Sequence, residues 1–228
     1  MEEKKKKEVV ETDNERADTD KNMLVSQNEY IESGIYIGSR VKASRMKRFI
    51  YRVRDDGIYL LNIEEIDKRI KAAANMISRY NGSDIVITAS RLYAISAAEK
   101  FAEIIGAKIV KDRVNPGIFT NPNNNILYLE PKLVIINDTR NERQAVREAS
   151  KINVPIIALC DTDNSISYVD LVIPANNRGK RSLTLIYYLL AREVLKNKGL
   201  IKSNSEFKYT ISDFEGKITA TQNQTDQQ

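Results

Sequence analysis

The chain contains no histidine and a single cysteine, Cys160, among its 228 residues. Without histidine it lacks the commonest general base and the commonest zinc ligand, so Ser-His and Cys-His nucleophile pairs cannot be built from it. A single cysteine excludes an internal disulfide and fits a reducing compartment. No apolar run approaches the roughly 18 residues that a membrane helix needs, and the first seven residues are too polar for a signal peptide. We therefore expect a soluble, intracellular protein.

The positive charge is concentrated between the two ends of the chain. The whole chain has 36 Lys and Arg against 31 Asp and Glu, a net charge of +5. Residues 1–25 hold 6 basic and 8 acidic side chains and residues 203–228 hold 2 and 4, so residues 26–202 carry an excess of nine positive charges. This excess suggests a polyanionic partner, although a merely soluble basic protein would show the same balance.

Composition divides the chain into three parts. Residues 1–25 and 203–228 are polar and poor in large apolar side chains, which predicts disorder at both ends of the free protein, over residues 1–25, in particular 1–21, and over residues 205–228. Residues 26–202 alternate apolar strands with amphipathic helices. Near-continuous apolar runs, such as 133–136 and 156–159, are typical of parallel strands buried on both faces. The pattern predicts a doubly wound α/β fold, with a mainly parallel sheet flanked by helices in a flavodoxin-like or Rossmann-like three-layer sandwich.

The individual elements follow from periodicity and turn residues. Two β-rich runs around Asp55-Asp56-Gly57 predict a small β-hairpin. From Asn62, which can cap a helix, apolar residues recur at helical spacing, and we expect Gly82 to end that helix. The other expected helices are 24–32, 91–105, 141–152 and 181–198, and the expected strands are 49–53, 58–61, 84–88, 107–110, 133–137, 155–160 and 171–173.

Phosphate-binding loops of the usual kinds are missing from the sequence. No Gly-x-Gly-x-x-Gly follows a strand, and Gly179-Lys180-Arg181 lacks the glycines of a Walker loop. Aspartates do follow two neighbouring strands, at Asp138 and at Asp161 with Asp163. They could converge on Mg²⁺ in a phosphoryl or nucleotide enzyme, or they could cap helices and form Asx turns. We expect no catalytic residue, no metal and no cofactor, and keep the magnesium enzyme as the alternative.

Residues 40–54 carry seven basic side chains and no acidic one. Lys and Arg neutralise phosphates and release counterions, and the interleaved Phe49 and Tyr51 could stack on unpaired bases. The alternative is a solvated hairpin face whose aromatic rings pack on the core. We predict RNA contacts for the first five of these cations: Arg40, Lys42, Arg45, Lys47 and Arg48.

Two more polar clusters follow strands, where ligands meet parallel sheets. Residues 174–182 place two asparagines, a glycine and three cations at the start of a helix, where backbone amides favour a phosphate. Capping by one of the asparagines is compatible with this interpretation. The loop 113–122 is long and polar, as contact loops on rigid scaffolds often are. We predict RNA contacts for Arg113, Asn115, Thr120, Asn121, Asn176, Asn177, Arg178, Lys180 and Arg181.

Short motifs extend from about Tyr30 to Leu200. They include Gly34-Ile-Tyr-Ile-Gly38, Ile50-Tyr-Arg-Val-Arg54, Gly57-Ile-Tyr-Leu-Leu61, Val154-Pro-Ile-Ile-Ala-Leu-Cys-Asp-Thr-Asp163, Ile173-Pro-Ala-Asn-Asn177 and Leu189-Leu-Ala-Arg-Glu193. Together these strings resemble the universal small-subunit ribosomal protein S-two family. The long coiled-coil insertion of bacterial members is missing after the hairpin, so the chain is most similar to the archaeal and eukaryotic, laminin-receptor-like branch.

The resemblance implies a structural constituent of the small ribosomal subunit, cytoplasmic and ribosome-bound. Such a protein binds ribosomal RNA and neighbouring ribosomal proteins, supports subunit assembly and translation, and has no membrane or small-molecule partner. The resemblance also implies that residues 161–163 belong to the family scaffold. Two positions depart from the family pattern: Tyr36 stands where many members have histidine, and Val114 where many have an aromatic residue. We assign no contact to either position.

Overall fold

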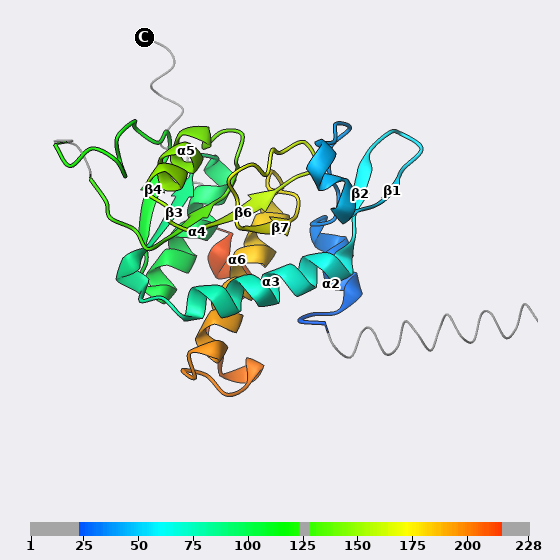
Figure 1. Ribbon diagram of the computed structural model, residues 1–228. Coiled ribbons are helices and arrows are strands. Elements are labelled where there is room, and N and C mark those ends of the chain that lie inside the picture. The colour runs from blue at the N-terminus through cyan, green and yellow to red at the C-terminus, as the bar shows by residue number, and fades with distance from the viewer. Residues whose placement is uncertain (1–22, 124–127, 216–228) are drawn as a thin grey trace, which may run out of the picture.

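Five short aliphatic strands form a parallel sheet at the centre of the molecule (Figure 1). The computed structural model describes residues 23–123 and 128–215, and the disorder expected of residues 1–22 and 216–228 concerns segments outside that description. The strand order β4-β3-β5-β6-β7 confirms the predicted doubly wound fold, because it is the flavodoxin-like order. The strands are β3 (Ile85–Ala89), β4 (Lys108–Lys111), β5 (Leu133–Ile136), β6 (Ile156–Cys160) and β7 (Leu171–Pro174).

The three inner strands β3, β5 and β6 are buried on both faces because each is an almost unbroken aliphatic run. Every one of their residues is buried, whereas the edge strand β4 has exposed lysines at both ends. The register places Ile87 beside Ile135 and Ile135 beside Ile157, so a row of isoleucines crosses the core. Since all five strands run in parallel, the loops that follow them lie together at the carboxyl ends of the strands. Most of the predicted sites lie in these loops.

Helices cover the two faces of the sheet unequally. One face carries α3 (Ile63–Ser78), α4 (Leu92–Ile105) and α6 (Lys180–Asn197), with α6 packed between the other two. The other face carries α5 (Arg143–Lys151) and no further helix within the described ranges (Figure 1). Crossovers between parallel strands are right-handed, so the chain stays on one face as it moves from β5 through β6 to β7. Among the described residues, no helix is long and apolar enough to cross a membrane.

The predicted hairpin forms beside the β7 edge of the sheet. Strand β1 (Ile50–Val53) pairs antiparallel with β2 (Tyr59–Leu61), and helix α2 (Gln27–Ser33) precedes them. The backbone N–H of Asn176, just after β7, donates to the Ile35 carbonyl at 2.8 Å. This bond ties the N-terminal unit to the sheet.

One of the two expected boundaries of α3 holds, and the other is wrong. Asn62 caps the helix as predicted, since its side chain accepts from the Glu64 amide at 2.9 Å. The helix ends before Gly82, which instead begins the short 3₁₀ turn η2 (Gly82–Asp84). A Cβ added at Gly82 would lie 2.1 Å from the Ile105 carbonyl oxygen. The glycine is therefore required by the close approach of two backbones and not by a helix end.

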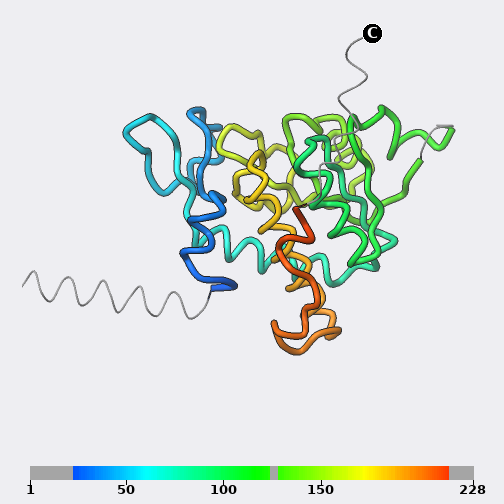
Figure 2. The backbone as a smooth tube through the Cα atoms, turned by 180° about the vertical axis from the view of Figure 1, so that it is seen from behind, coloured from blue at the N-terminus to red at the C-terminus, as the bar shows by residue number. Residues whose placement is uncertain are grey.

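The folded chain continues past its predicted end at residue 202. The 3₁₀ turn η3 (Asn204–Glu206) and helix α7 (Ile211–Phe214) bring Phe207 and Phe214 onto Tyr188, with ring centroids 5.3 and 5.9 Å away. Both phenylalanine side chains are buried. Figure 2 shows this segment, orange to red, folded back along the body of the molecule. The expectation of a disordered tail does not describe residues 205–215, because the widely spaced Phe207 and Phe214 rings both pack on Tyr188 of α6.

Candidate nucleic-acid interface

A buried threonine holds the backbone that leads into the predicted basic stretch. Thr162 follows β6, and its carbonyl accepts from the Ala43 amide at 2.7 Å. Its hydroxyl accepts from the Ser39 amide at 3.0 Å and donates to the Val41 carbonyl at 2.9 Å. A Cβ at Gly38 would lie 2.5 Å from Thr162 Cγ2, so only glycine permits this approach. The backbone here is thus fixed to the carboxyl edge of the sheet.

The cations of residues 40–48, hereafter the basic segment, lie at the surface, where the Arg48 guanidinium covers the Phe49 ring at 4.6 Å and the Lys42 ammonium lies 5.0 Å from the Tyr59 ring. Met46 and Phe49 are buried and anchor the 3₁₀ helix η1 (Ser44–Phe49), so the positions between and beside them face outward. Within the described ranges the five predicted cations are exposed and form no ion pair: Arg40, Lys42, Arg45, Lys47 and Arg48. Exposed cations without a carboxylate partner are free to meet an external anion.

The two aromatic residues of this stretch lie in different environments. Phe49 is 1% exposed and belongs to the core, so its ring cannot stack on a base. Tyr51 is 71% exposed on β1 and remains accessible. The alternative of rings packed on the core therefore holds for Phe49 alone.

Two asparagines before α6 serve the fold. Asn177 is fully buried, and its side-chain amide donates to the carbonyls of Asn137 (3.2 Å) and Leu159 (3.3 Å). We therefore correct its predicted RNA contact, because this amide links the ends of β5 and β6 inside the protein. Asn176 Oδ1 accepts from two following backbone amides, both at 3.0 Å, and so caps the turn that leads into the helix.

Arginines neutralise the aspartates of the alternative magnesium site. The pairs are Arg91 with Asp138 at 2.6 Å, Arg140 with Asp163 at 3.1 Å, and Arg178 with both Asp163 and, at 3.7 Å, Asp161. Burial raises the pKa of the Asp161 carboxyl above its ordinary value. Among the described residues, no group of three Cys, Asp or Glu side chains is placed to hold a metal ion.

Two predicted contacts near the start of α6 are engaged within the chain. Arg178 binds the carboxylates after β6, and Lys180 lies 3.4 Å from Glu215. Arg181 is exposed and has no ion-pair partner in the part of the chain that the structure describes. Of the three cations, Arg181 is therefore the most free to meet a phosphate.

A buried carboxylate that the sequence did not single out as a site residue organises the 113–121 loop. Glu148 of α5 accepts from the amides of Gly117 (2.7 Å) and Phe119 (3.0 Å), from the Thr120 hydroxyl (3.3 Å) and from the Gln144 side chain (2.6 Å). Burial alone would raise the pKa of Glu148, but these hydrogen bonds outweigh it and lower the pKa below its ordinary value. The loop therefore presents its other predicted residues in exposed positions: Arg113, Asn115 and Asn121.

The predicted residues form two surfaces rather than one. The basic segment and the start of α6 lie beside β7, whereas the 113–121 loop follows β4 at the opposite edge of the sheet (Figure 1). A small ligand cannot touch both surfaces. A large, structured polyanion can.

Comparison with known proteins identifies the family. Residues 30–130 and 125–197 match the family described as Ribosomal protein S2. A relative in Thermoplasma acidophilum, named Small ribosomal subunit protein uS2, is 47% identical over 199 residues, which cover 87% of this chain and 100% of the relative. The chain belongs to this family.

Other members of the ribosomal protein S2 family agree with this assignment. Relatives with the same name are 48% identical in Thermoplasma volcanium (86% of this chain, 98% of the relative) and 41% identical in Saccharolobus solfataricus (86% of this chain, 84% of the relative). The basic segment, Thr162 and Glu148 all lie within the residues that match the S2 family. The family resemblance inferred from short motifs is thus confirmed.

Proposed function

We propose that this chain is a structural constituent of the small ribosomal subunit, where it binds ribosomal RNA and neighbouring ribosomal proteins and supports subunit assembly and translation. The basic segment is the observation that carries the proposal. Its five exposed cations have no ion-pair partner within the described ranges, and Thr162 fixes the backbone that presents them. Such a row suits RNA phosphates, because neutralising them releases bound counterions. The name of the relatives, small ribosomal subunit protein uS2, is in line with this role.

The proposed RNA contacts omit the buried Asn177. Among the remaining predicted residues, those that are exposed and unpaired are expected to make the main contacts. The basic segment and Arg181 would make the main phosphate contacts, with Asn176, Arg178 and Lys180 beside them. The 113–121 loop, with Arg113, Asn115, Thr120 and Asn121, would form a second contact. In this proposal the protein is cytoplasmic and ribosome-bound.

The alternative of a magnesium-dependent phosphoryl enzyme has no support. Each aspartate it requires is paired with an arginine, whose positive charge opposes cation binding. Membership of a ribosomal-protein family also favours a structural role.

We expect the triple variant Arg45→Gln, Lys47→Gln, Arg48→Gln to bind small-subunit RNA more weakly while it keeps its fold. Each lost phosphate contact should reduce the slope of log K against log salt by roughly 0.7 to 0.9, so the slope should flatten by about 2 to 3. Exposed surface substitutions of this kind cost within about 0.5 kcal/mol each. The measurement is a salt titration of binding to a small-subunit RNA fragment, with a melting curve for each protein.

A matched control removes the same charge elsewhere. Lys196, Lys202 and Lys208 are exposed and lie on or after α6, so their triple Gln variant should keep the wild-type salt slope. If the two triple variants behave alike, the basic segment is a solvated face and the proposed contact is wrong. In cell extracts, sedimentation of the wild type as a free soluble peak, away from small subunits, would contradict the function itself.

A further inference from the structure

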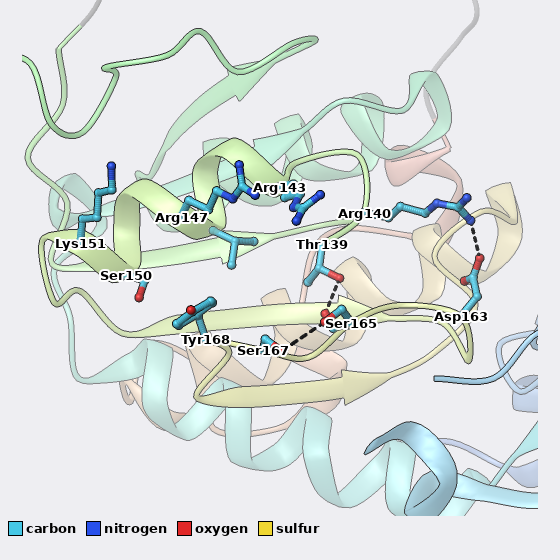
Figure 3. A pocket seen from close by; sticks show the side chains of 11 residues that line it. Thr139, Arg140, Arg143, Arg147, Ser150, Lys151, Asp163, Ser165, Ser167 and Tyr168 are labelled. Atoms are coloured by element: carbon cyan, nitrogen blue, oxygen red, sulfur yellow. Dashed lines mark hydrogen bonds and ion pairs between the residues drawn. The ribbon is translucent and has the colours of Figure 1, made fainter. Parts of the chain in front are cut away.

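A groove of about 1070 Å³ runs between α5 and residues 161–170, the segment that joins β6 to β7 (Figure 3). This connection contains no helix, although the connection before it contains α5. Both must lie on the same face of the sheet, because successive right-handed crossovers move in one direction from β5 to β7. The missing helix leaves one side of α5 uncovered, and the groove occupies that space.

One wall of the groove is a row of cations on α5. Arg143, Arg147 and Lys151 recur at every fourth position, so they share one face of the helix and follow each other at a rise of about 6 Å. All three are exposed, and none forms an ion pair within the described ranges. In Figure 3 they extend along the upper wall, with Arg140 and Asp163 paired at the far end.

The other wall presents Tyr168 in a conformation that a tyrosine rarely adopts. Its backbone has φ 65°, in the left-handed region, and the residue is 69% exposed. Glycine would adopt this backbone without strain, and a bulky side chain there is a marked exception. Because the ring is mostly exposed, burial in the core does not account for it. Strained residues that packing does not explain concentrate at functional sites.

We propose that this groove binds an unpaired stretch of RNA, with phosphates along Arg143, Arg147 and Lys151 and a base stacked on Tyr168. The inference rests on the proposed function and adds a third RNA surface, on the face of the sheet that α5 covers. An acidic peptide would need the cations alone, whereas an accessible aromatic face and the exposed hydroxyls of Ser165 and Ser167 suit a base and a ribose. Aromatic stacking of this kind tolerates any base, so the contact should show little sequence preference.

Two sets of variants of the full-length chain separate charge from stacking. With oligouridylate as the probe, the triple variant Arg143→Gln, Arg147→Gln, Lys151→Gln should flatten the salt slope by about 2, as expected for three single-strand phosphate contacts. The Lys196, Lys202 and Lys208 triple variant is the control for net charge and should keep the slope. Tyr168→Phe should bind as the wild type does, because it keeps the ring.

Tyr168→Gly distinguishes a binding role from a structural one. It should melt at or above the wild-type temperature, since glycine relieves the left-handed strain, and yet bind oligouridylate about tenfold more weakly. Unchanged RNA affinity in this variant and in the α5 triple variant overturns the inference, and competition by polyglutamate as strong as by RNA would assign the groove to an acidic protein. If either result overturns the groove proposal while the wild type still binds small-subunit RNA, the proposed function stands. If the wild type binds neither RNA, both proposals fail.

Discussion

Replacing Glu148 by alanine is expected to lower the free energy of unfolding by about 3 kcal/mol and to release the 113–121 loop. Glu148 is 2% exposed, and its carboxylate accepts four hydrogen bonds, two of them from the backbone amides of Gly117 and Phe119. Alanine leaves these donors without a partner in a site that water barely reaches, and each unsatisfied buried donor costs about 1 to 3 kcal/mol. Urea unfolding measures the loss of stability, and limited proteolysis reports whether the loop opens.

Two conservative variants show whether the carboxylate itself is responsible. Glu148→Gln keeps the shape and one accepting oxygen, so it should lose less stability than alanine does. Gln144→Ala removes one of the four contacts and should leave the loop resistant to protease. A Glu148→Ala protein with wild-type stability and an intact loop would show that the loop is held by its own packing on the core.

The sheet could be predicted because burial on both faces leaves an unbroken aliphatic signature. The runs at β5 and β6 contain no polar residue that could face water, and the change to helical spacing after Asn62 marks α3. The C-terminal packing could not be predicted in the same way. Phe207 and Phe214 stand in a polar stretch with no periodicity, and only the position of Tyr188 on α6 gives them a common site.

The predicted site residues also differ in how far the sequence alone can place them. Charge is visible in the sequence, and the structure leaves the five cations of the basic segment exposed. Burial was not visible, so Asn177 resembled a surface residue, although its amide bridges two strand ends. The cations of the α5 groove had a signal, the spacing of Arg143, Arg147 and Lys151 by four. That spacing is equally typical of a solvated helix face, and only the missing helix after β6 distinguishes the two.

Raising the pH from 5 to 8 is expected to lower the free energy of unfolding by between about 2 and 3 kcal/mol through Glu142. This carboxyl is fully buried, and burial raises its pKa to about 7 from an ordinary 4.5. Hydrogen bonds from the Thr88 hydroxyl (2.5 Å), the Ser90 amide and hydroxyl (both 3.0 Å) and the Asn137 amide (3.1 Å) oppose this shift without cancelling it. The folded protein therefore holds a proton that the unfolded chain releases between pH 4.5 and 7. That proton stabilises the fold fully below pH 4.5, and the stabilisation is lost as the pH rises through 7.

The Glu142→Gln variant isolates this effect, because it removes the titrating group and keeps the size of the side chain. It should be less stable than the wild type at every pH, since an amide nitrogen cannot accept the hydrogen bonds made to one carboxylate oxygen. Between pH 5 and 8, however, the free energy of unfolding of this variant should fall much less than that of the wild type. Glu148 disturbs the comparison little, because its hydrogen bonds lower its pKa, away from the pH range of this test. Urea unfolding of both proteins at a series of pH values gives the two slopes. Equal slopes would mean that Glu142 is already ionised at pH 5 and that its four donors outweigh the cost of burying the charge.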